Sequence, residues 1–216
     1  MYYPIFMDIN DKVCVVVGGG QVALRKVKNV LECGAKVKVI SPEICPEIEN
    51  LSENSSLTLI KRKYRAGDLD GATVAFSATG DPDTNHQISQ DARKQSIPVN
   101  IVDDAACSDF IVPSYFSRGD IIIAVSTSGK SPALARKIRM ELEKCVGDEF
   151  TDLVVIVNEV RTKVIGDGMR IDGEMWQEAL DINGLLNLVR EGRRDEARRL
   201  LLDGLLSGTV SDGEPR

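Results

Sequence analysis

The sequence predicts an α/β protein with a parallel, doubly wound sheet, then a small α/β region and a helical C-terminal region. Two observations support this fold class. Apolar runs without polar alternation, typical of strands buried on both faces, recur through the first half of the chain and are separated by helical patterns. Closely spaced short strands and then amphipathic helices follow. Right-handed crossovers between parallel strands leave few other arrangements of the first half.

The first βαβ unit lies between Lys12 and Ser41. Val13 to Val17 form an unbroken apolar strand, and three glycines follow at once. A helix opens directly after them, ends at Gly34 and leads into a second strand, Lys36 to Ile40. Its apolar positions are three or four residues apart, so they form one stripe that can lie on a sheet: Ala23, Val27, Val30 and Leu31.

The glycines fit a dinucleotide fingerprint, G-x-G-x-x-[G/A]. Gly18 permits the tight turn, Gly20 lets the backbone approach a diphosphate, and Ala23 allows close packing of helix on strand. The helix start then offers free N–H groups to the phosphates. Ser41 occupies the position where an Asp or Glu would bind the ribose, so this position leaves NAD and NADP both open.

The remaining elements of this domain follow in order. We expect an apolar entry from Tyr3 to Ile9 packed on the edge of the sheet. We then expect a short helix at 42–50, strands at 57–61, 73–78 and 97–102, and a helix at 82–95 with Asp81 as its N-cap.

Ligands of such sheets bind beyond the carboxyl ends of the strands. This rule selects three segments, Gly18 to Val22, Ser41 to Glu43 and Ala78 to Asp81, with Asp103 beside them. The pair Asp103 and Asp104 is either a polar strand end or a site with a catalytic base. The candidate cofactor-binding residues are Gly18, Gly19, Gly20, Gln21, Val22, Ser41, Pro42, Glu43, Thr79 and Gly80.

The second half changes pattern. Short strands at 109–112, 115–117 and 121–126 suggest hairpins, and a helix follows Ser131, a natural N-cap, to about Lys144. The rest is helical, with Trp176 as a packing residue and a tail that frays after Ser207. We therefore predict a dinucleotide-binding domain at 1–112, a small region at 113–146 and a helical domain at 147–216.

The stretch from Arg118 to Arg139 carries five basic residues and one acidic residue. It is either a solvated helix face or an anion site. In the second case the backbone of Ser126 to Gly129, together with Lys130 and Arg118, suits carboxylates.

Composition limits the function. The net charge of −6 argues against general nucleic-acid binding. The five cysteines lack zinc spacing and indicate thiols in a reducing compartment. A single histidine, His86, is more typical of a surface residue than of a catalytic one and cannot complete a tetrahedral metal cage. The N-terminus lacks signal-peptide features and no apolar run reaches membrane-spanning length, so we expect a cytoplasmic protein.

Six motifs together identify a family. They are YPIF, VGGGQVALRK, GAKVKVISP, SATGDPDTN, VNIVDD and FIVPSYFSRGDIIIAVSTSGKSPALAR. In this combination the chain resembles the precorrin-2 dehydrogenase / sirohydrochlorin ferrochelatase family, the siroheme synthase N-terminal module, over about its first 145 residues. The C-terminal third resembles the family only in being helical.

The resemblance implies a Rossmann domain that binds NAD, a dimerisation region that exchanges elements between two protomers of a homodimer, and a helical cap. It implies hydride transfer from precorrin-2 to NAD+, with loss of a proton, to give sirohydrochlorin. In some members the same cleft inserts Fe2+. The family's key aspartate falls on Asp103, as proton acceptor and transient iron ligand, with no stable metal site. The octacarboxylate substrate gives Arg118, Ser126, Thr127, Ser128 and Lys130 a purpose as substrate-binding residues.

The chain departs from the family pattern at two points, and two alternative functions stay open. Thr127 stands where some relatives carry a regulatory serine, which puts that role in doubt. No methyltransferase segment is present, so we expect no trifunctional synthase. The alternatives are a non-enzymatic sensor or carrier of NAD or a tetrapyrrole, and a different Rossmann reductase for a small anionic substrate.

Overall fold

The computed structural model describes residues 2–53 and 55–208, and its contacts divide the chain into two compact units. The first unit runs to Val112 and includes Ser128–Lys130; the second comprises Pro113–Thr127 and the chain from Ser131 onward. The division into three domains remains a prediction, and residues 209–216 of the tail expected to fray lie outside the described part.

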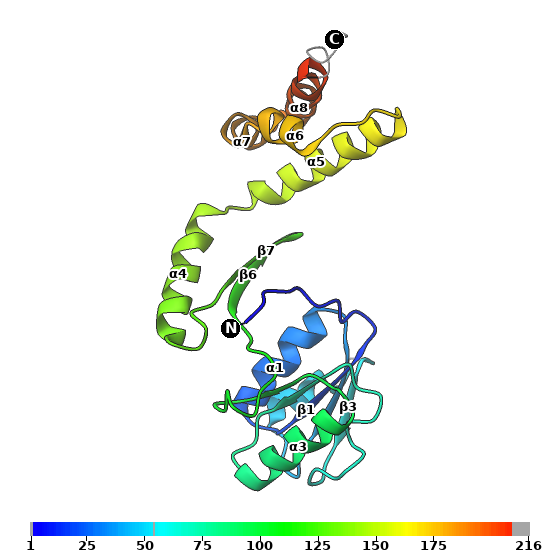
Figure 1. Cartoon of the computed structure of the whole chain (residues 1–216), viewed down its shortest axis with the longest axis vertical. Helices are drawn as coiled ribbons and strands as arrows, with labels where there is room; N and C mark the ends of the chain where they lie inside the picture. Colours follow the sequence, from blue (N-terminus) through cyan, green and yellow to red (C-terminus); the bar gives the residue numbers. More distant parts are fainter. Residues whose placement is uncertain (1, 54, 209–216) are drawn as a thin grey trace, which may run out of the picture. The chain divides into compact units, whose positions relative to one another are not determined.

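A parallel sheet forms the centre of the first unit (Figure 1), with the strand order β3-β2-β1-β4-β5. Val17, at the end of β1, pairs with Ile40 and with Ser77, so three neighbouring strands end at the same level. The strands are β1 (Val13–Val17), β2 (Lys36–Ile40), β3 (Leu57–Ile60), β4 (Val74–Ser77) and β5 (Val99–Ile101).

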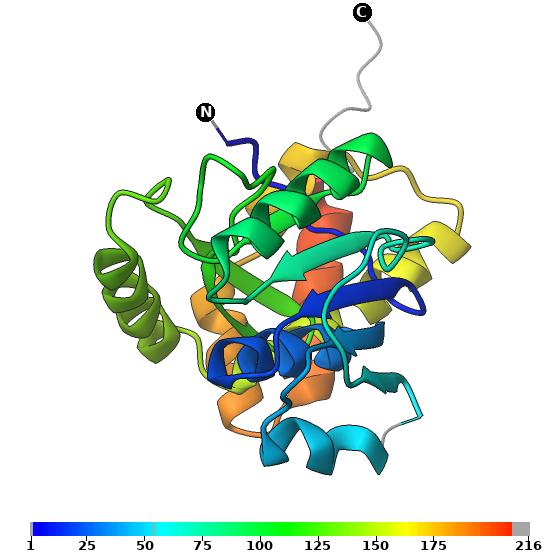
Figure 2. The same ribbon diagram turned by 90° about the horizontal axis from the view of Figure 1, so that it is seen from below.

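Helices cover both faces of this sheet (Figure 2). On one face α1 (Gln21–Glu32) buries Val27 against Val16, and the short α2 (Pro46–Glu49), which leads into a 3-10 turn at Asn50–Glu53, adds to the same core. On the other face α3 (Pro82–Lys94) packs Ile88 and Ala92 against Val15. Val15 and Val16 face opposite layers, as alternation along a strand requires. The predicted doubly wound α/β fold is confirmed.

Two helix ends behave as the sequence predicted. Asp81 caps α3, since its carboxylate accepts a hydrogen bond from the Asp83 N–H at 3.3 Å. Gly34 follows α1 with φ +76°, and its N–H donates to the Leu31 carbonyl at 2.9 Å. The sequence therefore predicted the start of α3 and the end of α1 correctly.

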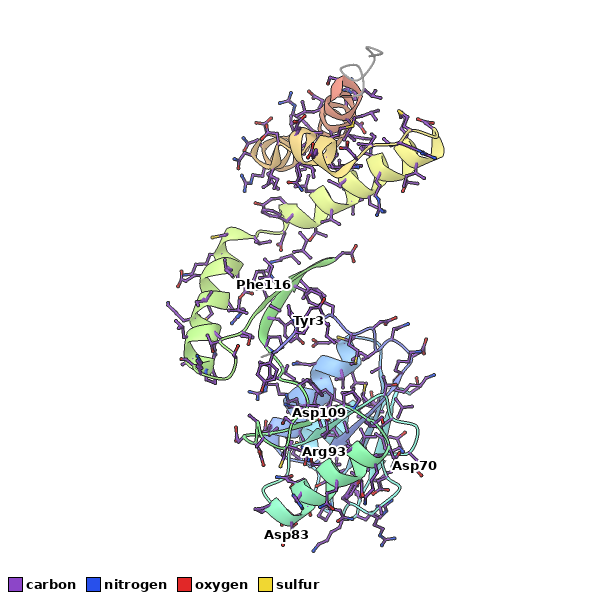
Figure 3. The ribbon with its side chains drawn as sticks, viewed as in Figure 1. Tyr3, Asp70, Asp83, Arg93, Asp109 and Phe116 are labelled. Atoms are coloured by element: carbon purple, nitrogen blue, oxygen red, sulfur yellow. The ribbon has the colours of Figure 1, made fainter. Side chains whose placement is uncertain are left out.

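Three expectations are wrong in detail. The segment from Tyr3 to Ile9 is not packed at the sheet edge: Tyr3 is 86% and Phe6 72% exposed, and only Ile9 packs on the core. No strand forms at 109–112. Side-chain bonds join this segment to β5 instead: the Asn100 amide donates to the Phe110 carbonyl at 3.0 Å, and the Asp109 carboxylate (labelled in Figure 3) accepts from the Val99 N–H at 3.0 Å. The second helix begins only at Pro46, since 42–45 form a loop.

The second unit begins with an antiparallel hairpin of β6 (Ser114–Arg118) and β7 (Ile121–Val125). Helix α4 (Pro132–Cys145) packs on this hairpin, and the Ser131 hydroxyl caps it by accepting from the Leu134 N–H at 3.2 Å. This confirms the predicted hairpin and N-cap.

A second core holds the helices that follow. Ile156, Leu185, Leu201 and Leu205 are fully buried in it, and Trp176 packs against it as predicted. Within the described residues no helix is both long and apolar enough to cross a membrane. The helices are α5 (Glu149–Gly166), α6 (Gly173–Ala179), α7 (Ile182–Arg190) and α8 (Arg194–Gly208).

Candidate functional site

A cavity of about 830 Å³ lies in the first unit, at the carboxyl ends of β1, β2, β3 and β4. This is the position at which doubly wound sheets bind ligands. The cavity is lined by Val17, Gly18, Gly19, Gly20, Ser41, Pro42, Glu43, Ile44, Cys45, Lys63, Tyr64, Ala78, Thr79, Gly80, Asp81 and Thr84.

The glycine turn between β1 and α1 forms one wall, and its three glycines differ. Gly18 has φ +124°, and a Cβ there would lie 2.4 Å from the Ala78 carbonyl oxygen. At Gly19 a Cβ would lie 1.9 Å from the Glu43 carbonyl oxygen. Nothing lies within 4 Å of a Cβ position at Gly20, which faces open space. Gly18 and Gly19 are therefore required by the fold, and Gly20 leaves room for a ligand.

The start of α1 is left open toward an anion. Gly20 is its N-cap, no side chain caps the helix, and its first turn contains no acid. The first N–H groups of an α-helix have no partner within the helix and attract phosphate. Gln21 and Val22 belong to this turn, but their side chains do not line the cavity; the Gln21 amide donates to the Glu47 carboxylate at 2.9 Å. Gln21 and Val22 can therefore contact a phosphate only through their backbone N–H groups.

The turn after β4 lies beside the glycine turn, forms a second wall and is held by Asn85. The amide oxygen of Asn85 accepts from the Thr79 hydroxyl at 2.9 Å and from the Ser77 hydroxyl at 2.6 Å. Asp81 also lines the cavity, and the hydroxyl of Thr84, which donates to its carboxylate, holds the pKa of Asp81 below its usual range. The wall is therefore rigid and carries a negative charge.

The loop after β2 closes the site. The Ser41 N–H donates to the Ile60 carbonyl at 3.1 Å, and the Cys45 N–H donates to the Gly19 carbonyl at 2.8 Å. Glu43 is exposed at the wall, two residues after Ser41. With the empty space at Gly20 and the uncapped helix start, the residues present fit a dinucleotide: the glycine turn would hold its diphosphate and the loop after β2 its ribose.

Lys63 and Tyr64 line the cavity although they were not among the predicted residues. They follow β3, whose carboxyl end lies at the same edge of the sheet as those of β1 and β2. The rule that selected the other loops, applied also to this strand, would have found them.

Asp103 lies outside the cavity lining but leaves the sheet at the same edge. Ile101 pairs with Ser77, and the Val102 N–H donates to the Ser77 carbonyl at 2.9 Å, so Asp103 emerges beside the turn after β4. Asp103 is exposed and has φ +61°, a left-handed conformation that is uncommon outside glycine. It is therefore not part of the packed interior.

Side chains that follow Asp103 fix its backbone. The Asp104 carboxylate accepts from the N–H groups of Ala106 and Cys107, each at 3.0 Å, and the Cys107 N–H is the main cause of a lowered pKa of Asp104. The Ser108 hydroxyl accepts from the Ile101 N–H at 2.9 Å. Asp104 thus has a structural role, which separates the two members of the predicted acidic pair.

The predicted substrate-binding residues fall in both units. In the second unit Arg118 pairs with Glu143 and Asp148, each at 3.5 Å, and its guanidinium lies 5.6 Å from the Phe116 ring centre. The Thr127 hydroxyl accepts from the Ser131 N–H at 3.0 Å. Ser126, Ser128 and Lys130 are exposed, and Lys130 makes no ion pair with another described residue.

In the described part of the chain, the side chains that could bind a metal are dispersed. Within residues 2–53 and 55–208, no three His, Cys, Asp or Glu side chains gather closely enough to hold a metal ion. All five cysteines are unpaired. His86 is exposed on α3, with its Nε2 atom 2.8 Å from the Gln90 amide nitrogen.

Two family models match the chain. Residues 5–114 match a family described as "Putative NAD(P)-binding", and residues 118–144 match one described as "Sirohaem biosynthesis protein central". The first match contains the entire cavity lining.

Related proteins and a solved structure agree with these matches. The siroheme synthase of Thioalkalivibrio sulfidiphilus is 36% identical over 210 residues, which are 96% of this chain and 42% of that protein. The siroheme synthase of Pseudomonas fluorescens is 34% identical over 204 residues, covering 94% and 44%. The chain thus spans less than half the length of these relatives. The structure of "SirC, precorrin-2 dehydrogenase" has the same fold, with a TM-score of 0.67 and 24% identity over 95% of this chain and all of that one.

Proposed function

Because the chain belongs to the NAD(P)-binding family matched by its residues 5–114, and is similar to siroheme synthases over almost its whole length, we propose that it oxidises precorrin-2 to sirohydrochlorin with NAD+. The observation that carries the proposal is the cavity at the strand ends, with room for a diphosphate at Gly20 and with Asp103 emerging at the same sheet edge.

The reaction removes one hydride and one proton from the substrate. When bound, the nicotinamide ring accepts the hydride, and sirohydrochlorin, reduced dinucleotide and a free proton result. The chain's own residues orient the reactants and take the proton. We assign the proton to the carboxylate of Asp103, since it is exposed and its left-handed backbone turns it out of the sheet.

The binding roles follow the walls of the cavity. Gly18, Gly19 and Gly20, with the backbone of Gln21 and Val22, would hold the diphosphate. Ser41, Pro42 and Glu43 would hold the adenosine ribose, and Thr79 and Gly80 would position the nicotinamide half. Glu43 favours NAD over NADP, because a carboxylate at the ribose repels a 2′-phosphate.

The remaining assignments of the proposal rest on the resemblance. They are substrate carboxylate binding by Arg118, Ser126, Thr127, Ser128 and Lys130, a homodimer, and transient Fe2+ transfer at Asp103. A cytoplasmic location is also proposed, from the sequence features given above.

The test is turnover of precorrin-2 by the purified chain, with NAD+ and NADP+ side by side, followed by the absorbance of sirohydrochlorin. Asp103→Asn keeps a residue that tolerates positive φ and removes the base, so kcat should fall at least about 100-fold while NAD+ binding is unchanged. Asp104→Asn is the matched control, because its amide oxygen still accepts both N–H groups. Equal turnover by wild type and Asp103→Asn would contradict the assigned base, and tight binding without any turnover would favour a sensor or carrier.

A further inference from the structure

The segment after β3 is fixed on both sides of one lysine, Lys63. Before it, the Arg62 guanidinium makes two hydrogen bonds of 2.7 Å to the Asp68 carboxylate and donates to the carbonyl oxygen of Lys63 itself at 3.0 Å. After it, the Arg65 N–H donates to Asp68 at 2.8 Å. Asp68 therefore holds the backbone on either side of Lys63.

The neighbouring Tyr64 adds a third anchor. It is 8% exposed, and its hydroxyl donates to the Asp91 carboxylate of α3 at 3.2 Å. Burial and the adjacent Asp91 raise the pKa of Tyr64, so the phenol stays protonated and keeps this hydrogen bond. The backbone of Lys63 is thus held in place beside the cavity.

In contrast, the side chain of Lys63 is unpaired. It is exposed and lines the cavity, and it makes no hydrogen bond or ion pair with another residue in the described part of the chain. The basic residues before it are both paired, Arg62 with Asp68 and Lys61 with Glu49. A cation on a fixed backbone at a cavity wall, with no hydrogen bond or ion pair to a described residue, indicates a ligand of negative charge.

The charge of the cavity supports the same conclusion. Its lining contains two carboxylates, Glu43 and Asp81, and Lys63 as the one basic side chain among the described lining residues. The charge of Lys63 contributes to lowering the pKa of Asp81, so the ammonium group acts on the wall near the turn after β4. A diphosphate carries two negative charges and would be repelled by the carboxylates if Lys63 were absent.

We propose that Lys63 binds the diphosphate of the dinucleotide and complements the N–H groups of the glycine turn. This inference rests on the dinucleotide site of the proposed function and adds to it a residue that discriminates charged from uncharged nucleotide ligands. The ammonium group supplies the charge, and the glycine turn supplies the directional hydrogen bonds.

The test measures affinity by calorimetry on the full chain, with ADP-ribose, adenosine, NAD+ and NADP+ as probes. Lys63→Ala should weaken ADP-ribose and NAD+ about tenfold, reduce the dependence of affinity on salt, and leave adenosine unchanged. Lys63→Arg should recover most of the loss. Lys61→Ala is the matched control, since Lys61 is the same residue type, lies two residues away and does not line the cavity.

Three results would overturn the inference: unchanged ADP-ribose affinity in Lys63→Ala, an equal loss in Lys61→Ala, or a loss confined to NADP+, which would place the lysine at the 2′-phosphate. A wild-type chain that binds ADP-ribose no better than adenosine would overturn both this inference and the dinucleotide site. Normal ADP-ribose binding with no oxidation of precorrin-2 would count against the proposed function alone.

Discussion

Two basic regions of the molecule differ in how their charge is used. Five basic residues lie between Arg118 and Arg139, and three of them are paired: Arg118 and Arg139 both contact Glu143, and Lys137 pairs with Glu141. Among the described residues that line the cavity of the first unit, Lys63 is the one lysine, and its ammonium group makes no hydrogen bond or ion pair with a described residue. The number of charges in a stretch is therefore a poor guide to a ligand site, and the fraction left uncompensated by the fold is a better one.

The largest effect is expected for substitutions in the glycine turn after β1, where backbone N–H groups have no protein partner within the helix and can bind a ligand. Gly19→Ala forces a Cβ against the Glu43 carbonyl, so we expect a loss of about 3 kcal/mol in the free energy of unfolding and loss of NAD+ binding. Gly20→Ala has open space and should unfold like wild type in urea while binding NAD+ more weakly. Equal stability losses in the two variants would show that the turn is uniformly packed.

The next effect concerns a buried cation in the first unit. Lys26 is 8% exposed, its ammonium donates to the Asn100 amide oxygen at 3.2 Å and lies 5.3 Å from the centre of the Phe76 ring, and burial lowers the pKa of Lys26 to about 8. Between that value and the ordinary lysine pKa, the unfolded chain binds the extra proton, so this group makes stability rise with pH.

Lys26→Met should remove this contribution. The unfolding free energy of wild type relative to the variant should rise by about 2 kcal/mol between about pH 8 and pH 10. Taking the difference is necessary, because burial raises the pKa of Cys14 from 9.0 to about 11, and the stability linked to that thiol is lost in the same range. A difference that does not change with pH would mean that Lys26 stays charged in the folded protein.

A smaller effect is expected for Arg118, whose partners are all protein groups. Arg118→Ala should lower the free energy of unfolding by about 1 kcal/mol, since partly exposed ion pairs contribute little and the contact with Phe116 adds to them. Lys130→Ala should leave stability unchanged. If both substitutions raise KM for precorrin-2 equally, paired and unpaired cations contribute equally to substrate binding. That result would contradict the conclusion that uncompensated charge marks a ligand site.

The smallest effect is expected at the exposed surface of α4. Lys137 pairs with Glu141 at i,i+4, and both side chains are about half exposed or more. Lys137→Ala should change the unfolding free energy by less than about 0.5 kcal/mol and should leave KM for precorrin-2 as it is. A clear change in KM would identify a substrate-binding role for this helix face.

The sequence predicted the features that depend on local periodicity. The strands of the sheet, the turn at Gly18 and the caps at Asp81 and Ser131 were found because each needs only neighbouring residues. The comparisons then agreed with the family that the motifs had indicated.

Features that depend on contacts between distant segments were missed. Examples are the contact of Gly19 with Glu43 and the anchoring of the chain after β3 by Asp68 and Asp91. Gly19 itself was among the predicted residues, and the strand-end rule extended to β3 would have found Lys63. The expected strand before Pro113 is replaced by side-chain bonds that join this segment to β5. None of these contacts produces a periodic pattern in the amino-acid sequence.

The close approach of Gly19 to Glu43 has one more consequence. With no room for even a methyl group between them, the turn after β1 and the loop after β2 must shift together or not at all. Any change of ligand that requires one of these two segments to move must therefore move the other as well.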